Sequence, residues 1–224
     1  MICGSNVVPR IEPFEQNVER YEAWFDRYPL AYESEIRAIR ELLPQSGEGL
    51  EVGVGTGRFA VPLGVRVGVE PSRAMGQLAI ERGVEVKFGV GEDLPYEDGR
   101  FAYLLLIVTV CFLDDVYLSL REAYRVLQPG GFVLIGFIDR VSPLGRTYEQ
   151  HREDNVFYRE ATFLSTEEVL FYLSQAGFGE FAFRQTIFQH PVEMKKADPV
   201  KPGYGKGSFV VVSATKLTEP GEHP

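Results

Sequence analysis

The sequence predicts a doubly wound α/β fold, in which helices cover both faces of a mostly parallel sheet. Seven short apolar segments alternate with amphipathic segments along the chain, as expected when each helix carries the chain back over the sheet to the next parallel strand. The length of 224 residues suits one domain of this class, and a composition with 45% hydrophobic and 25% charged residues is ordinary for a globular protein. We therefore expect a single domain over residues 1–224.

The N-terminal region predicts two helices before the first strand. Residues 14–44 are amphipathic, and the break between the helices falls at Tyr28-Pro29 because proline disfavours helical geometry in the residue before it. These helices form an expected N-terminal cap, residues 1–47. The expected strands are residues 49–54, 65–70, 84–88, 102–110, 132–138, 181–188 and 208–215.

Start and stop signals place the helices between these strands. Pro71-Ser72 opens one helix, and Asp114 and Asp115 cap another. The segment Gln128–Gly131 reads QPGG, a stop and turn signal before the fifth strand. Ser165–Glu168 fits a capping box, and Gly177 follows the end of the helix that it opens.

Charge, cysteine and histidine content argue against several classes of function. The formal net charge is −9, whereas binding to nucleic acid or to an anionic membrane needs a basic field. Cys3 and Cys111 are too few for a disulfide framework, and Cys111 lies in an apolar run where we expect it to be buried. The three histidines lack the spacing of metal ligands, so no metal site is expected. We see neither a secretory signal nor an apolar stretch long enough to span a membrane, and expect a cytoplasmic protein.

An acid and three alternating glycines mark the end of the first expected strand. Residues 51–57 read EVGVGTG, which leaves bare backbone where a ligand approaches, and Glu70 ends the second expected strand. A carboxylate at that tip can accept hydrogen bonds from both hydroxyls of a ribose, so these residues predict a nucleoside site. Residues 55–60 also fit the loose dinucleotide pattern G-x-G-x-x-A, but Glu51 beside the turn suits a ligand with an ammonium group better than a pyrophosphate.

The stretch EVGVGTGR resembles the first motif of the class I S-adenosylmethionine-dependent methyltransferases. The likeness continues in family order through GVEPS, EDLP and REAYRVLQPGGFVLIG, and it covers roughly residues 48–138. The small UbiE-like methyltransferases, the methyltransferase type 11 group, are the most similar in pattern. This resemblance implies a Rossmann-like, mostly parallel seven-stranded sheet with an antiparallel last strand. Residues 48–138 would be the cofactor-binding core, 139–162 a substrate-side insertion, and 163–216 a C-terminal helix with a pair of strands.

The resemblance also implies S-adenosylmethionine as cofactor and the residues that surround it. Glu51 would lie near the ammonium of the methionine moiety, and Glu70 would bind the ribose hydroxyls. Thr109, at the tip of the fourth strand, would lie under the reacting sulfonium. The full implied set is Glu51, Gly53, Gly55, Thr56, Gly57, Glu70, Pro71, Ser72, Met75, Gly91, Glu92, Leu94, Thr109 and Val110.

The sequence departs from the family pattern at two positions. Val90 stands where the family often has an Asp that accepts a hydrogen bond from the adenine amino group, and Ala102 replaces the Asp of a common Phe-Asp pair. Either Glu92 replaces the missing hydrogen bond or the affinity for the cofactor is lower.

Aromatic residues in the N-terminal cap have two interpretations. They form either a core stripe between helix and sheet or a lid over the cofactor, where aromatic faces stabilise a sulfonium. The set is Tyr21, Trp24, Phe25, Tyr28 and Tyr32. Tyr21 and Trp24 are the best candidates for a lid. Methyl transfer from a sulfonium is an in-line displacement, so alignment and exclusion of water are its main requirements.

We expect the substrate to meet the insertion of residues 139–162, because ligands of open α/β sheets bind outside the carboxyl ends of the strands. The candidates there are Asp139, Arg140, Tyr148, His151 and Tyr158. Each of them has an alternative role at the surface or in helix packing, and the catalytic residue stays open.

These observations favour a methyltransferase that acts on a small-molecule acceptor, as a monomer or homodimer, without a nucleic-acid or membrane partner. Two alternatives stay open. One is an NAD(P)-binding oxidoreductase, which rests on the dinucleotide pattern. The other is a non-catalytic S-adenosylmethionine-binding partner protein, which the departures at Val90 and Ala102 suggest.

Overall fold

Within residues 11–217, which the computed structural model describes, the sheet has eight strands in the order β3-β2-β1-β4-β5-β8-β6-β7. Cys3 and His223 lie outside the described residues. The strands are β1 (Gly49–Val52), β2 (Val67–Glu70), β3 (Glu85–Phe88), β4 (Phe101–Ile107), β5 (Leu127–Ile138), β6 (Phe178–Thr186), β7 (Lys201–Pro202) and β8 (Phe209–Lys216).

The first five strands are parallel, and β8 inserts antiparallel between β5 and β6. The predicted Rossmann-like sheet with an antiparallel last strand is therefore confirmed. The expected count of seven strands was one too few, because the two-residue β7 pairs antiparallel with the outer edge of β6. This short pairing lies in a proline- and glycine-rich segment that gives no strand signal.

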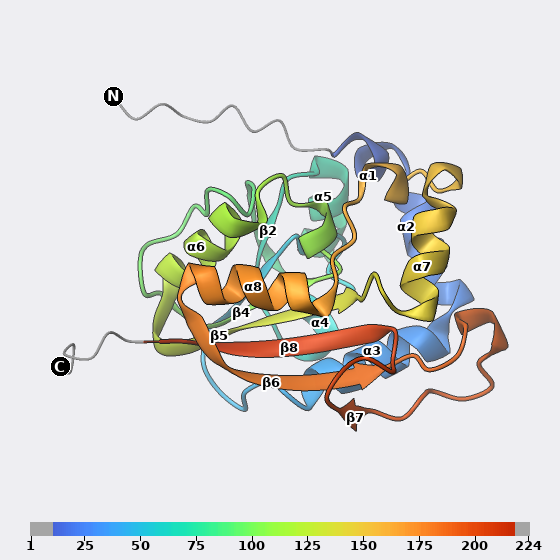
Figure 1. Ribbon diagram of the computed structural model, residues 1–224. Coiled ribbons are helices and arrows are strands. Elements are labelled where there is room, and N and C mark those ends of the chain that lie inside the picture. The colour runs from blue at the N-terminus through green and yellow to red at the C-terminus, as the bar shows by residue number, and fades with distance from the viewer. Residues whose placement is uncertain (1–10, 218–224) are drawn as a thin grey trace.

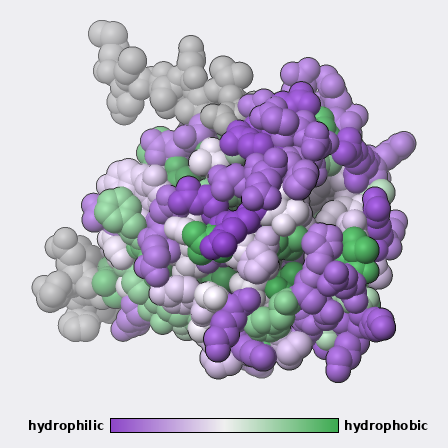
Figure 2. Space-filling view, turned by 45° about the vertical axis from the view of Figure 1, so that its right-hand side comes forward, coloured by the Kyte–Doolittle hydropathy of each residue, from purple (hydrophilic) through white to green (hydrophobic). Residues whose placement is uncertain are grey.

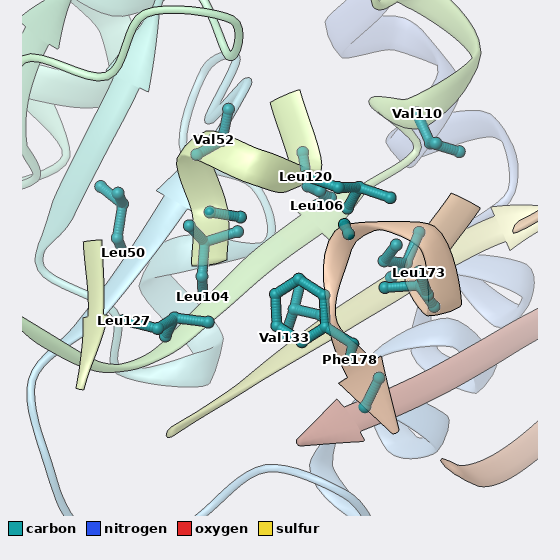
Figure 3. Close-up of a cluster of buried hydrophobic side chains, with 14 of the residues drawn as sticks. Leu50, Val52, Leu104, Leu106, Val110, Leu120, Leu127, Val133, Leu173 and Phe178 are labelled. Carbon is teal, nitrogen blue, oxygen red and sulfur yellow. The ribbon is translucent and has the colours of Figure 1, made fainter. Parts of the chain in front are cut away.

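Helices cover both faces of the sheet (Figure 1). α6 (Val116–Val126) and α8 (Thr166–Ala176) pack on one face, and α3 (Pro29–Arg40), α4 (Ala60–Leu63) and α5 (Arg73–Glu81) pack on the other. Strand β4 supplies both layers, because successive side chains of a strand point to opposite faces. Leu104 and Leu106 meet Leu120 of α6 and Leu173 of α8 in the layer shown in Figure 3, whereas Leu105 belongs to the opposite layer.

The predicted helix caps are present. Ser165 and Glu168 form the capping box of α8, and Gly177 ends that helix with a φ of 100°. Asp115 caps α6 by accepting a hydrogen bond from the N–H of Leu118. Such caps satisfy N–H groups that have no partner within the helix.

Two predicted boundaries were wrong. β4 ends at Ile107 and not at Val110, because the chain turns sharply at Val108, which has a φ of 56°. Residues 128–131 do not form a turn before the fifth strand. β5 begins at Leu127, immediately after α6, and residues 128–131 form an irregularity within β5. The remaining predicted strands differ from the observed ones by up to three residues at their ends.

The N-terminal cap and the insertion lie together at one end of the sheet (Figure 1). Within the described residues three helices precede β1, where two were expected: α1 (Glu12–Gln16), α2 (Val18–Arg27) and α3. The predicted break at Tyr28 is confirmed, and a second break lies at Asn17. The insertion is not an irregular loop. It contains α7 (Pro143–Gln150) and two short 3₁₀ turns, η2 (Arg152–Asp154) and η3 (Tyr158–Glu160).

The outer surface is mixed in character. On the face shown in Figure 2, hydrophobic side chains are scattered among hydrophilic ones. Over residues 11–217, every helix is too short or too polar to cross a membrane.

Candidate active site

A cavity of about 470 Å³ lies at the carboxyl ends of β1, β2 and β4. Its floor is the glycine turn and the strand tips, and its walls come from the N-terminal helices and the insertion. Of the residues singled out in the sequence, those that line it are Tyr21, Trp24, Phe25, Tyr28, Gly53, Gly55, Glu70, Pro71, Met75, Val90, Gly91, Glu92, Thr109, Tyr148 and Tyr158.

The glycine turn has a backbone that only glycine adopts readily. Gly53, Gly55 and Gly57 have φ values of 69°, 55° and 80°, in the left-handed region. A Cβ atom at Gly53 would lie 2.5 Å from Cγ2 of Thr109, and one at Gly55 would lie 3.2 Å from the hydroxyl of Tyr21. The three glycines therefore serve both the conformation of the turn and the close approach of neighbouring groups.

Glu70 connects the tip of β2 to this turn. Its two carboxylate oxygens accept hydrogen bonds from the backbone N–H groups of Gly55, at 2.8 Å, and Ser72, at 2.9 Å. Burial raises the pKa of Glu70 to about 7, although these two hydrogen bonds act in the opposite direction. Each carboxylate oxygen has a second lone pair, so Glu70 can still accept from a ligand.

Glu51 is a buried carboxylate with unused capacity. It lies on β1, its side chain is 1% exposed, and its Oε2 atom has no hydrogen-bond partner among the described residues. Burial, together with the nearby charge of Glu70, raises the pKa of Glu51 well above its usual range. Glu51 is not part of the cavity wall, whereas Tyr21 is. Burial raises the pKa of Tyr21, and the charge of Glu51 raises it further. A buried acceptor of this kind is costly unless a donor reaches it.

Glu92 is partly committed to the protein itself. Its Oε1 atom accepts hydrogen bonds from the backbone N–H groups of Asp114, at 2.9 Å, and Asp115, at 3.1 Å. These bonds hold the loop before α6 against the cavity. Val90 also lines the cavity, so the position of the family's Asp does face this space.

Besides Glu51, five residues of the implied cofactor set lie outside the cavity wall: Thr56, Gly57, Ser72, Leu94 and Val110. Leu94 and Val110 are buried in the hydrophobic layer under α6. Thr56 and Ser72 are buried, and both donate to carboxylates of the N-terminal helices. The Thr56 hydroxyl donates to Glu22 at 2.5 Å, and the Ser72 hydroxyl donates to Glu15 at 2.6 Å.

These two acids attach the N-terminal helices to the strand tips, and no motif in the sequence marks them. Glu22 of α2 also accepts from the guanidinium groups of Arg58 and Arg82, and Arg82 donates in turn to the Thr56 carbonyl. Hydrogen bonds from Arg82, Arg58 and Thr56 lower the pKa of Glu22 to about 2 against the opposing effect of burial. The helices are therefore held over the glycine turn by an ionised network.

All five aromatic cap residues belong to the hydrophobic layer between the N-terminal helices and the sheet. Tyr32 packs against Phe25 at 5.0 Å between ring centroids, and its hydroxyl donates to the Arg58 carbonyl. Tyr21, Trp24, Phe25 and Tyr28 also line the cavity.

The insertion contributes two of its five candidates to the cavity, Tyr148 and Tyr158, whose ring centroids are 4.8 Å apart. Asp139 is buried elsewhere, where it accepts from the Thr166 hydroxyl at 2.7 Å. His151 is exposed at the end of α7, and its Nδ1 lies 3.0 Å from the Thr147 carbonyl.

Arg140, the remaining candidate of the insertion, forms an ion pair with Glu168 at 2.8 Å. Cys111 is buried as expected, which raises its pKa to about 12.

Glu35 is a charged residue of the cavity wall that no motif in the sequence marks. It lies on α3, its side chain is 4% exposed, and its Oε2 atom has no hydrogen-bond partner among the described residues. Burial raises its pKa to about 8. One signal was available, because Glu35 falls on the apolar stripe of α3 between Ala31 and Ile39, where a carboxylate is out of place.

Comparison with known proteins agrees with this geometry. The methyltransferase domain family model matches residues 50–135. A solved structure from Thermotoga maritima, named "SAM-dependent methyltransferase, possible histamine N-methyltransferase", is 50% identical, with a TM-score of 0.90 and coverage of 92% of this chain and 99% of that chain.

Two relatives at the sequence level extend this picture. The protein MJ1123 of Methanocaldococcus jannaschii is 42% identical over 204 residues, which are 91% of this chain and 98% of that protein. The demethylmenaquinone methyltransferase of Roseiflexus castenholzii is 28% identical over 155 residues, which are 58% of this chain and 63% of that protein.

The oxidoreductase alternative is therefore set aside, because the family model, the Thermotoga structure and the Roseiflexus enzyme are all methyltransferases. The motif order, the strand order and these likenesses agree on one conclusion. The chain belongs to the class I S-adenosylmethionine-dependent methyltransferases, with S-adenosylmethionine as its cofactor.

Proposed function

We propose that this enzyme transfers the methyl group to a small-molecule acceptor inside the cavity at the strand tips. The observation that carries the proposal is the size of this cavity and its position under the N-terminal helices. Its volume of about 470 Å³ suits a small-molecule site, and the N-terminal helices of the same chain close one side of it. A macromolecular acceptor would have to reach the reacting group past these helices. The name of the Thermotoga protein also points to a small amine as the acceptor of that relative.

The residues at the strand tips fit the cofactor. Glu51 offers a buried oxygen that has no partner within residues 11–217, and the ammonium of a methionine moiety would supply the missing donor, directly or through a water molecule. Gly53 and Gly55 leave bare backbone beside it. The free lone pairs of Glu70 would accept from the ribose hydroxyls, and Met75 would border the adenine.

The other members of the implied set have different tasks in this proposal. Pro71 and Gly91 would border the adenosine, and Thr109 would lie near the sulfonium. Thr56 and Ser72 would act through the helices that they hold, since their hydroxyls donate to Glu22 and Glu15.

The bound cofactor supplies a methyl group on a positively charged sulfur, which needs no further activation. The contribution of the chain is alignment and the exclusion of water. Tyr21 and Trp24 close the cavity from α2, and their faces would stabilise positive charge beneath them. Partial burial and the charges of Glu51 and Glu70 raise the pKa of Tyr21, so its hydroxyl stays protonated at neutral pH and can donate a hydrogen bond.

The second candidate is a non-catalytic partner protein that binds the cofactor. The observation in its favour is Val90, an apolar side chain in the cavity wall where the family often has an Asp.

We also propose that residues 1–224 form one domain and that the protein is located in the cytoplasm. We propose that it acts as a monomer or homodimer without a nucleic-acid partner.

Two linked measurements test the proposal. Calorimetry on the purified protein should show binding of S-adenosylhomocysteine and no comparable binding of NAD⁺. Transfer of a labelled methyl group from S-adenosylmethionine to a panel of small amines, alcohols, phenols and thiols should then give a labelled product. Cofactor binding without transfer to any acceptor would favour the non-catalytic candidate, and binding of NAD⁺ alone would contradict both.

A further inference from the structure

Glu35 is a cavity carboxylate that the cofactor residues leave unexplained. It lines the cavity from α3, a different element from those that carry Glu51, Glu70 and the glycine turn. Its side chain is 4% exposed, and Oε2 has no partner among the described residues. A buried polar group without a partner is costly, so either a ligand satisfies Glu35 or the fold tolerates the cost without benefit.

Aromatic side chains line the same cavity as this carboxylate. Tyr148 and Tyr158 are close enough for the charge of Glu35 to raise the pKa of each, in addition to the larger effect of burial. Trp24 and Tyr28 line the same cavity from the N-terminal helices. The combination of a carboxylate with aromatic faces favours a nitrogen cation over a neutral or anionic group, because both the carboxylate and the rings attract positive charge.

The charged residues of the cavity wall also favour a cationic acceptor. Glu35, Glu70 and Glu92 are acidic members of its wall, and the described wall residues include no lysine or histidine. The wall does contain Arg20 and Arg27, but the guanidinium of Arg27 lies over the ring of Tyr28, 5.4 Å from its centroid. The described wall residues from α3 and α7 include no arginine, so an anionic acceptor would meet Glu35 without a compensating cation from these helices.

We infer that the methyl acceptor is a small amine whose nitrogen is bound by the carboxylate of Glu35. The inference rests on the proposed methyl transfer in this cavity and names the substrate class of the same site. The acceptor enters as an ammonium ion, and its positive charge favours the ionised form of Glu35. The two groups pair, and the ammonium gives one proton to the carboxylate.

The neutral nitrogen then attacks the methyl carbon. The new C–N bond forms as the C–S bond breaks, and the electron pair of the broken bond stays on sulfur. The products are the methylated ammonium ion and S-adenosylhomocysteine. After they leave, Glu35 releases its proton to solvent, which balances the reaction. A pKa of about 8 suits a carboxylate that exchanges a proton with an amine near neutral pH.

Binding to the S-adenosylhomocysteine-loaded protein tests this inference without requiring turnover. The probes are amine and alcohol pairs with the same skeleton, namely butylamine with butanol, phenethylamine with 2-phenylethanol, and histamine with the corresponding imidazolyl ethanol. Calorimetry should show that at least one amine binds wild type at least tenfold more tightly than its alcohol. The comparison in wild type needs no variant.

The variant Glu35→Gln keeps the size of the side chain and removes its charge. It should lose the amine preference at least tenfold, while its affinity for S-adenosylhomocysteine stays within twofold of wild type. Glu33→Gln is the matched control, because Glu33 is exposed on the same helix, where it pairs with Arg37. This control should retain the amine preference.

Three results would overturn the inference. They are an alcohol that binds as well as its amine in every pair, an unchanged amine affinity in Glu35→Gln, and a methylated product from alcohols or thiols alone. In each of these cases cofactor binding still stands, so only the substrate class is wrong. Failure of wild type to bind S-adenosylhomocysteine would instead remove the proposed function itself.

Discussion

The backbone N–H of Gly55 donates a hydrogen bond of 2.8 Å to Oε2 of Glu70, so the tip of β2 fixes the turn that follows β1. A second bond of 2.9 Å, from the N–H of Ser72, fixes the start of α5 through the same carboxylate. The residue proposed to bind the ribose thus also sets the shape of the surface on which the cofactor rests.

Glu70→Ala should weaken binding of S-adenosylhomocysteine by about 1–3 kcal/mol, the usual cost of a lost hydrogen bond to a charged group. Calorimetry measures this change directly. Glu81→Gln is a suitable control, because Glu81 is an exposed residue at the end of α5. An unchanged dissociation constant in Glu70→Ala would refute the ribose assignment.

Gly53→Ala should damage the protein more than Gly64→Ala. Both glycines have a positive φ, of 69° and 78°, so each alanine carries a backbone cost of about 1–2 kcal/mol. Only at Gly53 does the new Cβ collide with a neighbour, Cγ2 of Thr109 at 2.5 Å, whereas space at Gly64 is open. Urea unfolding and cofactor titration of the two variants should differ, and equal behaviour would contradict the geometry of the turn.

Glu22→Gln should loosen the N-terminal helices. The change leaves Arg58 and Arg82 without their carboxylate, and we expect a loss of about 1–3 kcal/mol in the free energy of unfolding at pH 7. The pKa of Glu22 is lowered to about 2, so its stabilising effect is complete above about pH 4.5 and is lost as the pH falls from there towards 2.

The difference in stability between wild type and Glu22→Gln should therefore shrink over this acidic range. Glu19→Gln, at an exposed position of the same helix, should show neither effect. A constant difference between wild type and Glu22→Gln from pH 6 to pH 3 would show that Glu22 is not held in its ionised form.

Glu35→Gln should raise the stability of the protein without ligand at neutral pH. The pKa of Glu35 is raised to about 8, so the folded state binds a proton that the unfolded state releases above about pH 4.5. Wild type therefore loses stability as the pH rises from about 4.5 to 8, and the neutral Gln does not. The difference at pH 8 should be on the order of a few kcal/mol in favour of the variant. Thermal unfolding at pH 5 and pH 8 checks the sign, and a wild type that gains stability against the variant over this range would contradict it.

Val90→Asp should tighten cofactor binding by about 0.5–1.5 kcal/mol, because it restores an acceptor for the adenine amino group. Val90 lines the cavity, whereas Glu92 uses Oε1 to accept from the N–H groups of Asp114 and Asp115. Val90→Asn is the control for size. Weaker binding in Val90→Asp would mean that another residue already satisfies the adenine.

Local patterns predicted the fold well because strand alternation, caps and glycine positions depend on neighbouring residues. The capping box at Ser165 and the glycine turn after β1 are of this kind. The errors came from tertiary effects. β4 was expected to continue to Val110 because its apolar run continues, but the chain turns at Val108 and Val110 enters a hydrophobic layer instead.

The site was predictable only where one motif carried it. Glu51, Gly53, Gly55 and Glu70 lie together because parallel strands end at one edge of a sheet. The insertion offered no such rule, and Asp139 and His151 have local partners in Thr166 and Thr147 instead of facing the cavity. Glu35 is distant in sequence from every motif, and only the packing of α3 brings it to the cavity.

The most direct test of the central claim is a crystal structure of the protein with S-adenosylhomocysteine. The proposal predicts the ribose hydroxyls within hydrogen-bond distance of Glu70, the homocysteine ammonium beside Glu51 or linked to it by one water, and the sulfur facing the part of the cavity between Tyr21 and Tyr148. A ribose bound away from Glu70, or a sulfur that points away from Glu35, would contradict it.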